Sequence, residues 1–338
     1  MAFLPVEARV NQILPGVQKV FTDAYLVQGM DKVQSYLSGL MDFNLKATAR
    51  KEKLAYPEAP PAVKRWDYGT TIQHGAFNYR QWEFDVLRWG LAIDWNVDDD
   101  ADDQLGALEK QAMNIAERYK YIPWQIAMQI LAGGTASANL LPGPLLAPDG
   151  VPLFSTTNGE GQPRFGRVGG NIVTGSGVAS EAALEKDVFA VQNAFAAFLD
   201  QAGQFRWRSW QTSTSLHLFV PFALREVFLK AFKRKGLSLA NLNGVTTAAA
   251  VAQITDEYVS QIVFAQELTG SDWFAVLSGA PTVATPMLCA PRDDATLYPV
   301  YPQTSGPQAE TDSVTLFSKA RWGFALGPCD AVIRVNNS

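Results

Sequence analysis

The sequence contains few of the residues that usually carry catalysis, and it carries little charge. Its 338 residues include two histidines and two cysteines, and charged residues make up 18% of the chain. Soluble proteins usually carry about 25% charged residues. Low charge together with nine Trp, ten Tyr and nineteen Phe suits a protein that lies against other subunits. A large core would give the same composition, so composition alone favours neither interpretation strongly.

Further absences argue against several classes of protein. The net charge of −5 and the pI of about 5.2 come without the basic stripe of a protein that grips nucleic acid. Cys289 and Cys329 lack the spacing of metal ligands, and we expect reduced thiols. The chain has no apolar run of about eighteen residues, so we expect no transmembrane helix. Its N-terminus has no signal-peptide pattern.

The candidates for chemistry lack supporting motifs. His74 and His217 have no catalytic motif around them, and we interpret both as structural. The acidic run Asp98–Asp103 could hold a divalent cation, but it lacks the spacing of a calcium loop, and helix capping is favoured. The glycines of residues 159–170 match no phosphate-binding motif and indicate a flexible loop. We therefore expect no catalytic residue, no metal and no cofactor.

The first hundred residues predict an arm followed by a ribbon. Short helices are expected at Asn11–Val20 and Thr22–Leu40, before a proline-rich segment that favours extended backbone. Residues 63–97 are rich in aromatic and β-branched side chains with partial alternation, which predicts a hairpin or extended ribbon with two partly apolar faces. A lone ribbon is marginal in water, so either a partner or the same chain must cover it.

A long helix with one apolar seam is predicted from Asp102 to Ala132. Pro123 lies inside this pattern, so we expect a kink or break near Tyr119–Ile122. The segment PLFSTT that follows the next loop is expected to form a short strand.

The second half of the chain alternates between strand and helix patterns. Ser180 is expected to cap a helix, Ser215–Val220 and Tyr258–Leu268 to form strands, and Pro221 to start another helix. The basic run Lys230–Gly236 suits a helix C-terminus, although it could instead face a polyanion. Together the patterns predict an α+β fold.

Three segments resemble a known family. They are the helix Asp102–Ala132 ending in LAGG, the DGVPLFSTTNG of Asp149–Gly159, and the KARWGFALGPCDAVIRV of Lys319–Val335. The chain resembles the major capsid proteins of tailed bacteriophages with the HK97-type fold, and among them the Mu-like major head subunit family. Thr157 stands where that family usually has a histidine.

The resemblance implies a division of the chain into named parts. Residues 1–61 would form an N-terminal arm, 62–100 an extended E-loop over an adjacent subunit, 101–177 the peripheral domain with its spine helix at 102–132, 178–298 the axial domain, and 299–338 the returning strands of the peripheral domain. Contacts between subunits are expected at the aromatic residues of the ribbon and of the end of the arm: Tyr56, Trp66, Tyr68, Phe77, Tyr79, Trp82, Phe84 and Trp89.

The resemblance also implies a function. The chain would be a non-enzymatic head protein of the virion, assembled in the host cytoplasm as hexamers and pentamers of an icosahedral shell. That shell would enclose double-stranded DNA without reading its sequence, and portal, scaffolding and decoration proteins are possible partners. We expect no membrane contact and no covalent cross-link. Because the chain begins with the arm, we expect any scaffold to be a separate protein.

Three alternatives stay open from the sequence. An encapsulin-like shell around protein cargo would have the same fold. A hydrolase would have to use Ser155 or the Asp98–Asp103 cluster. A minor structural virion protein, such as a portal or tail component, would differ in copy number.

Overall fold

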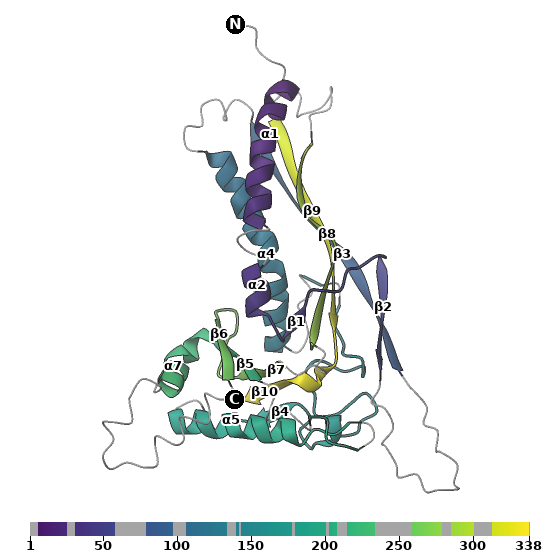
Figure 1. Cartoon of the computed structure of the whole chain (residues 1–338), viewed down its shortest axis with the longest axis vertical. Coiled ribbons are helices and arrows are strands. Elements are labelled where there is room, and N and C mark those ends of the chain that lie inside the picture. Colours follow the sequence, from purple (N-terminus) through teal and green to yellow (C-terminus); the bar gives the residue numbers. More distant parts are fainter. Residues whose placement is uncertain are drawn as a thin grey trace, which may run out of the picture.

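The structure is a computed structural model, and it describes most of the chain. The described residues are 6–25, 31–57, 79–96, 106–133, 140–141, 143–177, 180–200, 203–207, 215–233, 259–278, 285–300 and 313–337. They form an elongated molecule in which a column of long strands and helices stands on a wider base (Figure 1).

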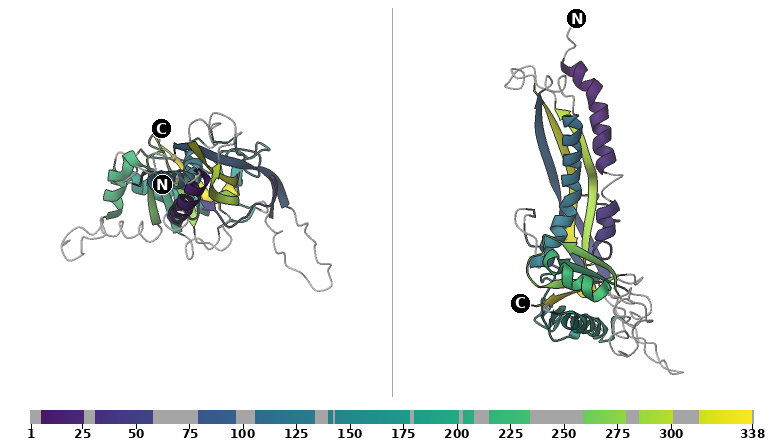
Figure 2. Two further views of the ribbon diagram at one scale, coloured as in Figure 1. Left: turned by 90° about the horizontal axis from the view of Figure 1, so that it is seen from above. Right: turned by 90° about the vertical axis from the view of Figure 1, so that its left-hand side faces the viewer.

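The column is built on a five-stranded sheet with the order β1-β8-β9-β3-β2. Its strands are β1 (Met41–Asp42), β2 (Lys51–Pro57), β3 (Tyr79–Asn96), β8 (Met287–Val300) and β9 (Ser313–Leu326). Strands β8, β9, β3 and β2 pair antiparallel, and β1 pairs parallel with β8. The helices α1 (Val6–Thr22), α2 (Asp31–Tyr36) and α4 (Ala107–Gly133) pack together along the column (Figure 2).

The base holds a second five-stranded sheet with the order β4-β10-β7-β5-β6. Its strands are β4 (Ile172–Thr174), β5 (Ser215–Pro221), β6 (Val259–Ala265), β7 (Trp273–Ser278) and β10 (Val332–Asn336). The helices α5 (Glu181–Ala196) and α7 (Arg225–Lys233) belong to the same unit. The predicted cap of α5 is confirmed, because Ser180 Oγ accepts a hydrogen bond from the Ala183 amide at 3.2 Å.

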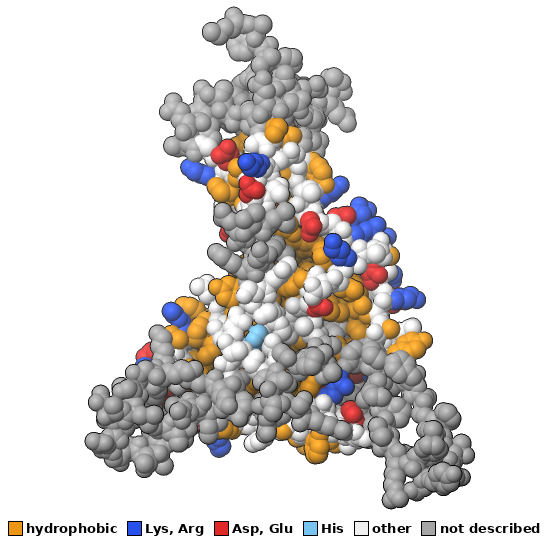
Figure 3. Space-filling model, in the orientation of Figure 1, with side chains coloured by type: hydrophobic (Ala, Val, Ile, Leu, Met, Phe, Trp, Pro, Cys, Tyr) orange, Lys and Arg blue, Asp and Glu red, His pale blue; other side chains and the backbone are white. Residues whose placement is uncertain are grey.

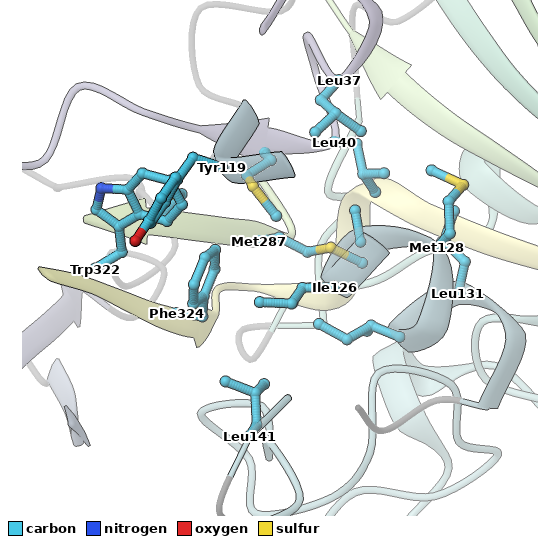
Figure 4. Close-up of a cluster of buried hydrophobic side chains, with 14 of the residues drawn as sticks. Leu37, Leu40, Tyr119, Ile126, Met128, Leu131, Leu141, Met287, Trp322 and Phe324 are labelled. Carbon is cyan, nitrogen blue, oxygen red and sulfur yellow. The ribbon is translucent and has the colours of Figure 1, made fainter. Parts of the chain in front are cut away.

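Helix α4 is the longest helix of the column, and its buried face packs in the core. Its 27 residues span about 40 Å at about 1.5 Å per residue. One face, which includes Tyr119, Ile126 and Leu131, is buried. Figure 4 shows this face against Trp322 and Phe324 of β9. The ring of Tyr119 meets that of Trp322 edge-on, with centroids 6.0 Å apart. Burying each large apolar side chain stabilises the fold by roughly 1.5–3 kcal/mol.

The expected break before Pro123 does not occur. The helix runs through this residue, which is itself buried. Buried side chains continue on both sides of it, from Ala116 and Tyr119 to Ile126 and Ala127. Packing against the sheet therefore holds the helix together although one backbone hydrogen bond is missing.

Three further expectations differ from the structure. Helix α2 covers only Asp31–Tyr36 of the helix that was expected at Thr22–Leu40. Helix α1 begins at Val6, before the expected start at Asn11. The segment PLFSTT forms no strand, because a buried arginine and an asparagine side chain bind its backbone groups, as described below. The prediction that residues 159–170 form a flexible loop is wrong, because hydrogen bonds hold this loop in place.

The chain passes between the two sheets near its C-terminal end. Strand β8 begins at Met287 and lies wholly in the column, so residue 298 falls inside it. Strand β10 does not return to the column beside β9. A 3-10 turn at Cys329–Ala331 leads it into the base, where it pairs with β4 and β7.

Candidate assembly interface

The strand pair β2–β3 stands at the side of the column and is the first candidate surface (Figure 1). Residues Lys51–Pro57 pair antiparallel with Tyr79–Asp85. From Val86 onward the same strand β3 pairs with β9 in the body of the sheet. One continuous strand therefore anchors the pair in the core of the column.

The two faces of this pair differ in chemistry. Gln81, Glu83 and Asp85 are exposed on one face, where Lys53 and Glu83 form an ion pair at 3.0 Å. Figure 3 shows positive and negative side chains mixed along this side of the molecule. Phe84 and Val86 on the other face are buried. The expectation of two partly apolar faces is therefore wrong for residues 81–86, because the chain covers one face and leaves the polar face in water.

The Phe84 ring packs closely against a glycine on β9. A Cβ atom on Gly323 would lie only 2.4 Å from the Phe84 ring, so this contact requires glycine. Phe84 also shares a small core with Ala290 and Ala325. It therefore belongs to the interior of its own subunit rather than to an exposed contact.

A cavity of about 450 Å³ lies beside the apolar face of the pair. Trp82 and Phe84 line it from β3, and Leu141, Leu145 and Leu146 line it from the segment after α4. The indole N–H of Trp82 has no acceptor among the described residues. A buried donor without a partner is unfavourable, so an acceptor from outside the described chain would stabilise this site.

The other residues expected at subunit contacts fall into three groups. Trp66, Tyr68 and Phe77 lie outside the described residues. Tyr79 is 56% exposed, and Tyr56 lies opposite Arg80 in the ladder. Trp89 is half-buried, with its ring edge-on to Phe324 at 6.1 Å. Among the expected contact residues, Tyr79 is thus exposed, whereas Trp82 and Trp89 are half-buried.

A buried arginine organises the loop between the column and the base. Arg164 is 2% exposed and forms a two-point ion pair with Asp149, with Nε–Oδ2 at 2.7 Å and Nη2–Oδ1 at 2.9 Å. Its Nη1 donates to the carbonyl of Leu153 at 2.7 Å. Asn171 donates to the same carbonyl and accepts from the Ser155 amide. These bonds replace the strand pairing that was expected for PLFSTT.

A second arginine–aspartate pair lies close by. Arg206 Nε donates to Asp330 Oδ2 at 2.7 Å. Burial raises the pKa of Asp330, and the positive charge of Arg206 opposes this effect. Both pairs, with Asp200, line a cavity of about 290 Å³. This cluster was not predicted from the sequence, although Arg164 stands out there as a charged residue in a loop rich in glycine.

Of the candidates for chemistry, Ser155 and His217 lie in the described residues, and each contacts a backbone carbonyl. Ser155 Oγ donates to the Thr157 carbonyl at 2.6 Å, which is a local turn contact. His217 Nδ1 lies 2.7 Å from the Ser38 carbonyl, and burial lowers the pKa of this histidine. His74 and the Asp98–Asp103 run lie outside the described residues. Within the described part of the chain, no group of three acidic, histidine or cysteine side chains is arranged to hold a metal.

Both cysteines are free and buried. Burial raises the pKa of both thiols, that of Cys329 to about 12, so they stay protonated near neutral pH. No helix in the described ranges is long and apolar enough to cross a membrane.

No family model and no curated protein matches the chain. Solved structures do resemble it. A chain in the capsid structure of the cyanophage P-SCSP1u is 9% identical, with a TM-score of 0.55 over 88% of this chain and 86% of that one. A chain in the mature capsid of bacteriophage PhiM1 is 10% identical, with a TM-score of 0.51 over 88% and 85%. A chain from Mycobacterium phage Patience is 14% identical, with a TM-score of 0.52 over 99% and 89%.

At such identities the likeness establishes the fold. The predicted α+β class is confirmed, and the narrower resemblance to Mu-like head subunits stays a prediction. The two-sheet architecture, with its long helix and its anchored strand pair, is the HK97-type fold of phage capsid proteins.

Proposed function

We propose that the chain is the major capsid protein of a bacteriophage, and that many copies assemble into a closed shell around the genome. The observation that carries this proposal is the fold, which extends over most of the chain and of the capsid proteins it resembles. The elongated subunit supports it, because a column whose helix α4 alone is about 40 Å long presents much surface to neighbours (Figure 1).

Within this proposal, the parts of the subunit would take the roles that the sequence resemblance implied. Helix α1 and its neighbours would be the arm, and the pair β2–β3 with the residues between them would be the E-loop over an adjacent subunit. The column with α4 would be the peripheral domain. The base would be the axial domain, with β10 included and β8 excluded, since the two sheets divide there.

The contacts between such subunits would be head-to-tail within a ring. A ring of this kind closes when the rotation between neighbours returns to the first copy. Hexamers and pentamers of one chain would then form an icosahedral shell. Individual contacts can be weak, because each subunit makes several at once.

The charge of the chain suits a container for DNA. With a net charge of −5, the chain would hold double-stranded DNA by enclosing it rather than by binding its phosphates tightly. Portal, scaffolding and decoration proteins would be its other partners. The virion would be its final location, after assembly in the host cytoplasm.

Nuclease protection tests the proposal. Particles that contain this chain should be purified, treated with DNase, and then extracted. We expect double-stranded DNA of uniform length that survives DNase only while the shell is intact. Particles that protect a folded enzyme instead of DNA would favour the encapsulin-like alternative, and a chain that never sediments as particles would contradict both.

A further inference from the structure

The upper half of β3 has an open edge. From Leu87 to Asn96 the strand pairs with β9, whereas β2 ends opposite Asp85. In the part of the chain that the structure describes, no strand pairs with the other side of this stretch. Figure 2 (right) shows β3 at the outer edge of the column, on the side away from α1.

Two hydrogen bonds show which residues face the open edge. The Val86 amide donates to the Arg50 carbonyl on the side of β2, at 2.8 Å. The Leu91 carbonyl accepts from Ser318 Oγ of β9, on the opposite side. Backbone groups alternate between the two sides of an antiparallel strand. The amides and carbonyls of the even-numbered residues therefore point outward: Arg88, Gly90, Ala92 and Asp94.

This edge lacks part of the usual protection against pairing. Natural sheets guard open edges with proline, with bulges or with charged side chains, above all lysine. The charged side chains of this edge are Arg88 and Asp94. Residues 87–96 contain no proline and no lysine, and their ladder with β9 has no register shift. The side chains of Leu87, Trp89, Leu91 and Ile93 along one face are only half-buried. An added strand would satisfy the backbone groups and cover these side chains at the same time.

The sequence of this edge is complementary to itself. We propose that it pairs with the same edge of a second copy, antiparallel about a two-fold axis at Leu91. In this register Arg88 lies opposite Asp94 of the second copy, and the reverse pair forms on the other side of the axis. Both side chains are exposed. The Asp94 carboxylate accepts a hydrogen bond from Thr315 Oγ1 of its own chain at 2.6 Å, and a carboxylate can accept further bonds beside it. Gly90 lies opposite Ala92, and Trp89 lies beside Ile93. Opposite charges in directly opposed positions stabilise a strand pair.

The length of the open edge supports the same register. Centring the pair on Gly90 would place Asp94 of the second copy opposite Val86, whose amide already binds Arg50. Centring it on Ala92 would place Asp94 opposite Gly90 and remove both ion pairs. The register at Leu91 uses residues 88–94 of each copy and leaves β2 undisturbed.

A cysteine at the axis tests the register. Residues that face away from the partner in such a pair have Cα atoms about 4.5 Å apart, within the range of about 4.4–6.8 Å for a disulfide. We expect Leu91→Cys to give a disulfide-linked dimer under mild oxidation, on a non-reducing gel. Ile93→Cys is the matched control, since its copies would lie about 14 Å apart. Absence of the link in folded Leu91→Cys protein, or equal linking of both variants, would overturn the proposal.

Charge exchange provides a second test that does not depend on cysteine. Arg88→Asp and Asp94→Arg each place like charges opposite each other twice, and we expect about tenfold weaker dimer formation in sedimentation velocity. The double exchange should restore association to the level of the original protein. Lys110→Asp, on the exposed face of α4, is the control for the change in net charge. A double exchange that stays as weak as the single variants would sink the proposal.

The two-fold contact goes beyond the proposed shell function. A chain that forms shells without the Leu91 link would contradict the contact alone. A chain that forms the link but never a closed particle would contradict the capsid function alone.

Discussion

The column and the base of the molecule are stabilised by different kinds of contact. In the column, α4 packs an apolar seam against β8 and β9, and Lys120 and Ser318 are its buried polar side chains in the described ranges. The base and its connection to the column bury more polar groups: Arg164, Asn171, Asp187, Gln192, His217 and Asp330. The column thus depends on shape and apolar area, whereas the junction depends on charges that must stay paired.

In the proposed shell subunit, this difference would keep the column stiff and hold the base at a defined angle to it. Apolar packing tolerates changes of pH and salt, because no charged group has to be satisfied. A buried ion pair is directional, and losing one partner leaves an uncompensated charge. The junction should therefore be more sensitive to single substitutions of charged residues than the column is.

The largest effect is expected when the junction loses its arginine. Arg164→Leu removes the donor that Asp149 and the Pro152 carbonyl share, while the Leu153 carbonyl keeps its bond from Asn171. The change should lower the free energy of unfolding by about 3–5 kcal/mol, because it leaves a largely buried carboxylate without its partner. Urea denaturation measures this loss. Arg321→Leu is the matched control in the column, where the pair with Asp293 is partly exposed, and should change stability by about 1 kcal/mol or less. Equal losses would contradict the comparison.

A cavity in the column should have the next largest effect. Leu131 is fully buried in the seam of α4, so Leu131→Ala should destabilise the protein by about 3 kcal/mol. Met113→Ala changes a side chain of the same helix that is 40% exposed, and it should have little effect. Both variants can be compared by thermal and urea unfolding, and a similar loss in both would contradict the position of the seam.

A smaller effect is expected from the polar contact inside the column. The Tyr119 hydroxyl donates to the Ser318 carbonyl at 2.9 Å. Removing it in Tyr119→Phe should lower stability by about 1 kcal/mol. Tyr121→Phe alters an exposed hydroxyl on the same helix and should be neutral. If the two variants unfold alike in urea, the buried hydrogen bond contributes nothing.

The smallest effect should be a pH dependence at the junction. His217 of β5 reaches Ser38 in the column, and burial lowers its pKa although the bond to the Ser38 carbonyl opposes this. The unfolded chain has a histidine pKa of about 6.5. Stability from the neutral form is therefore complete above about pH 6.5 and is lost as the pH falls from there through the lower folded-state pKa. His217→Gln removes this titration, and an unchanged slope of stability against pH would refute the assignment.

Local patterns in the sequence predicted many of the elements. The apolar period of α4, the Ser180 cap and the strand expected at Ser215–Val220 follow from local side-chain order. The structure confirms all three, with the strand one residue longer. The alternation along β3 identified an extended strand, because aromatic and β-branched residues mark it.

Long-range contacts account for the expectations that failed. Whether PLFSTT forms a strand depends on Arg164 and Asn171, which lie 11 and 18 residues beyond Leu153. Phe84 is buried because Gly323 leaves room for it on a strand that lies far along the chain. The position of β10 in the second sheet depends on the turn at Cys329–Ala331. Local periodicity contains no information about such partners.

Cryo-electron microscopy of the full chain, expressed alone and together with the products of neighbouring genes, tests the central claim most directly. We predict closed icosahedral particles in which every shell position fits the column and base described above, with the β2–β3 pair against an adjacent subunit. A chain that stays monomeric in both expressions, or particles whose shell density does not fit this fold, would contradict the account.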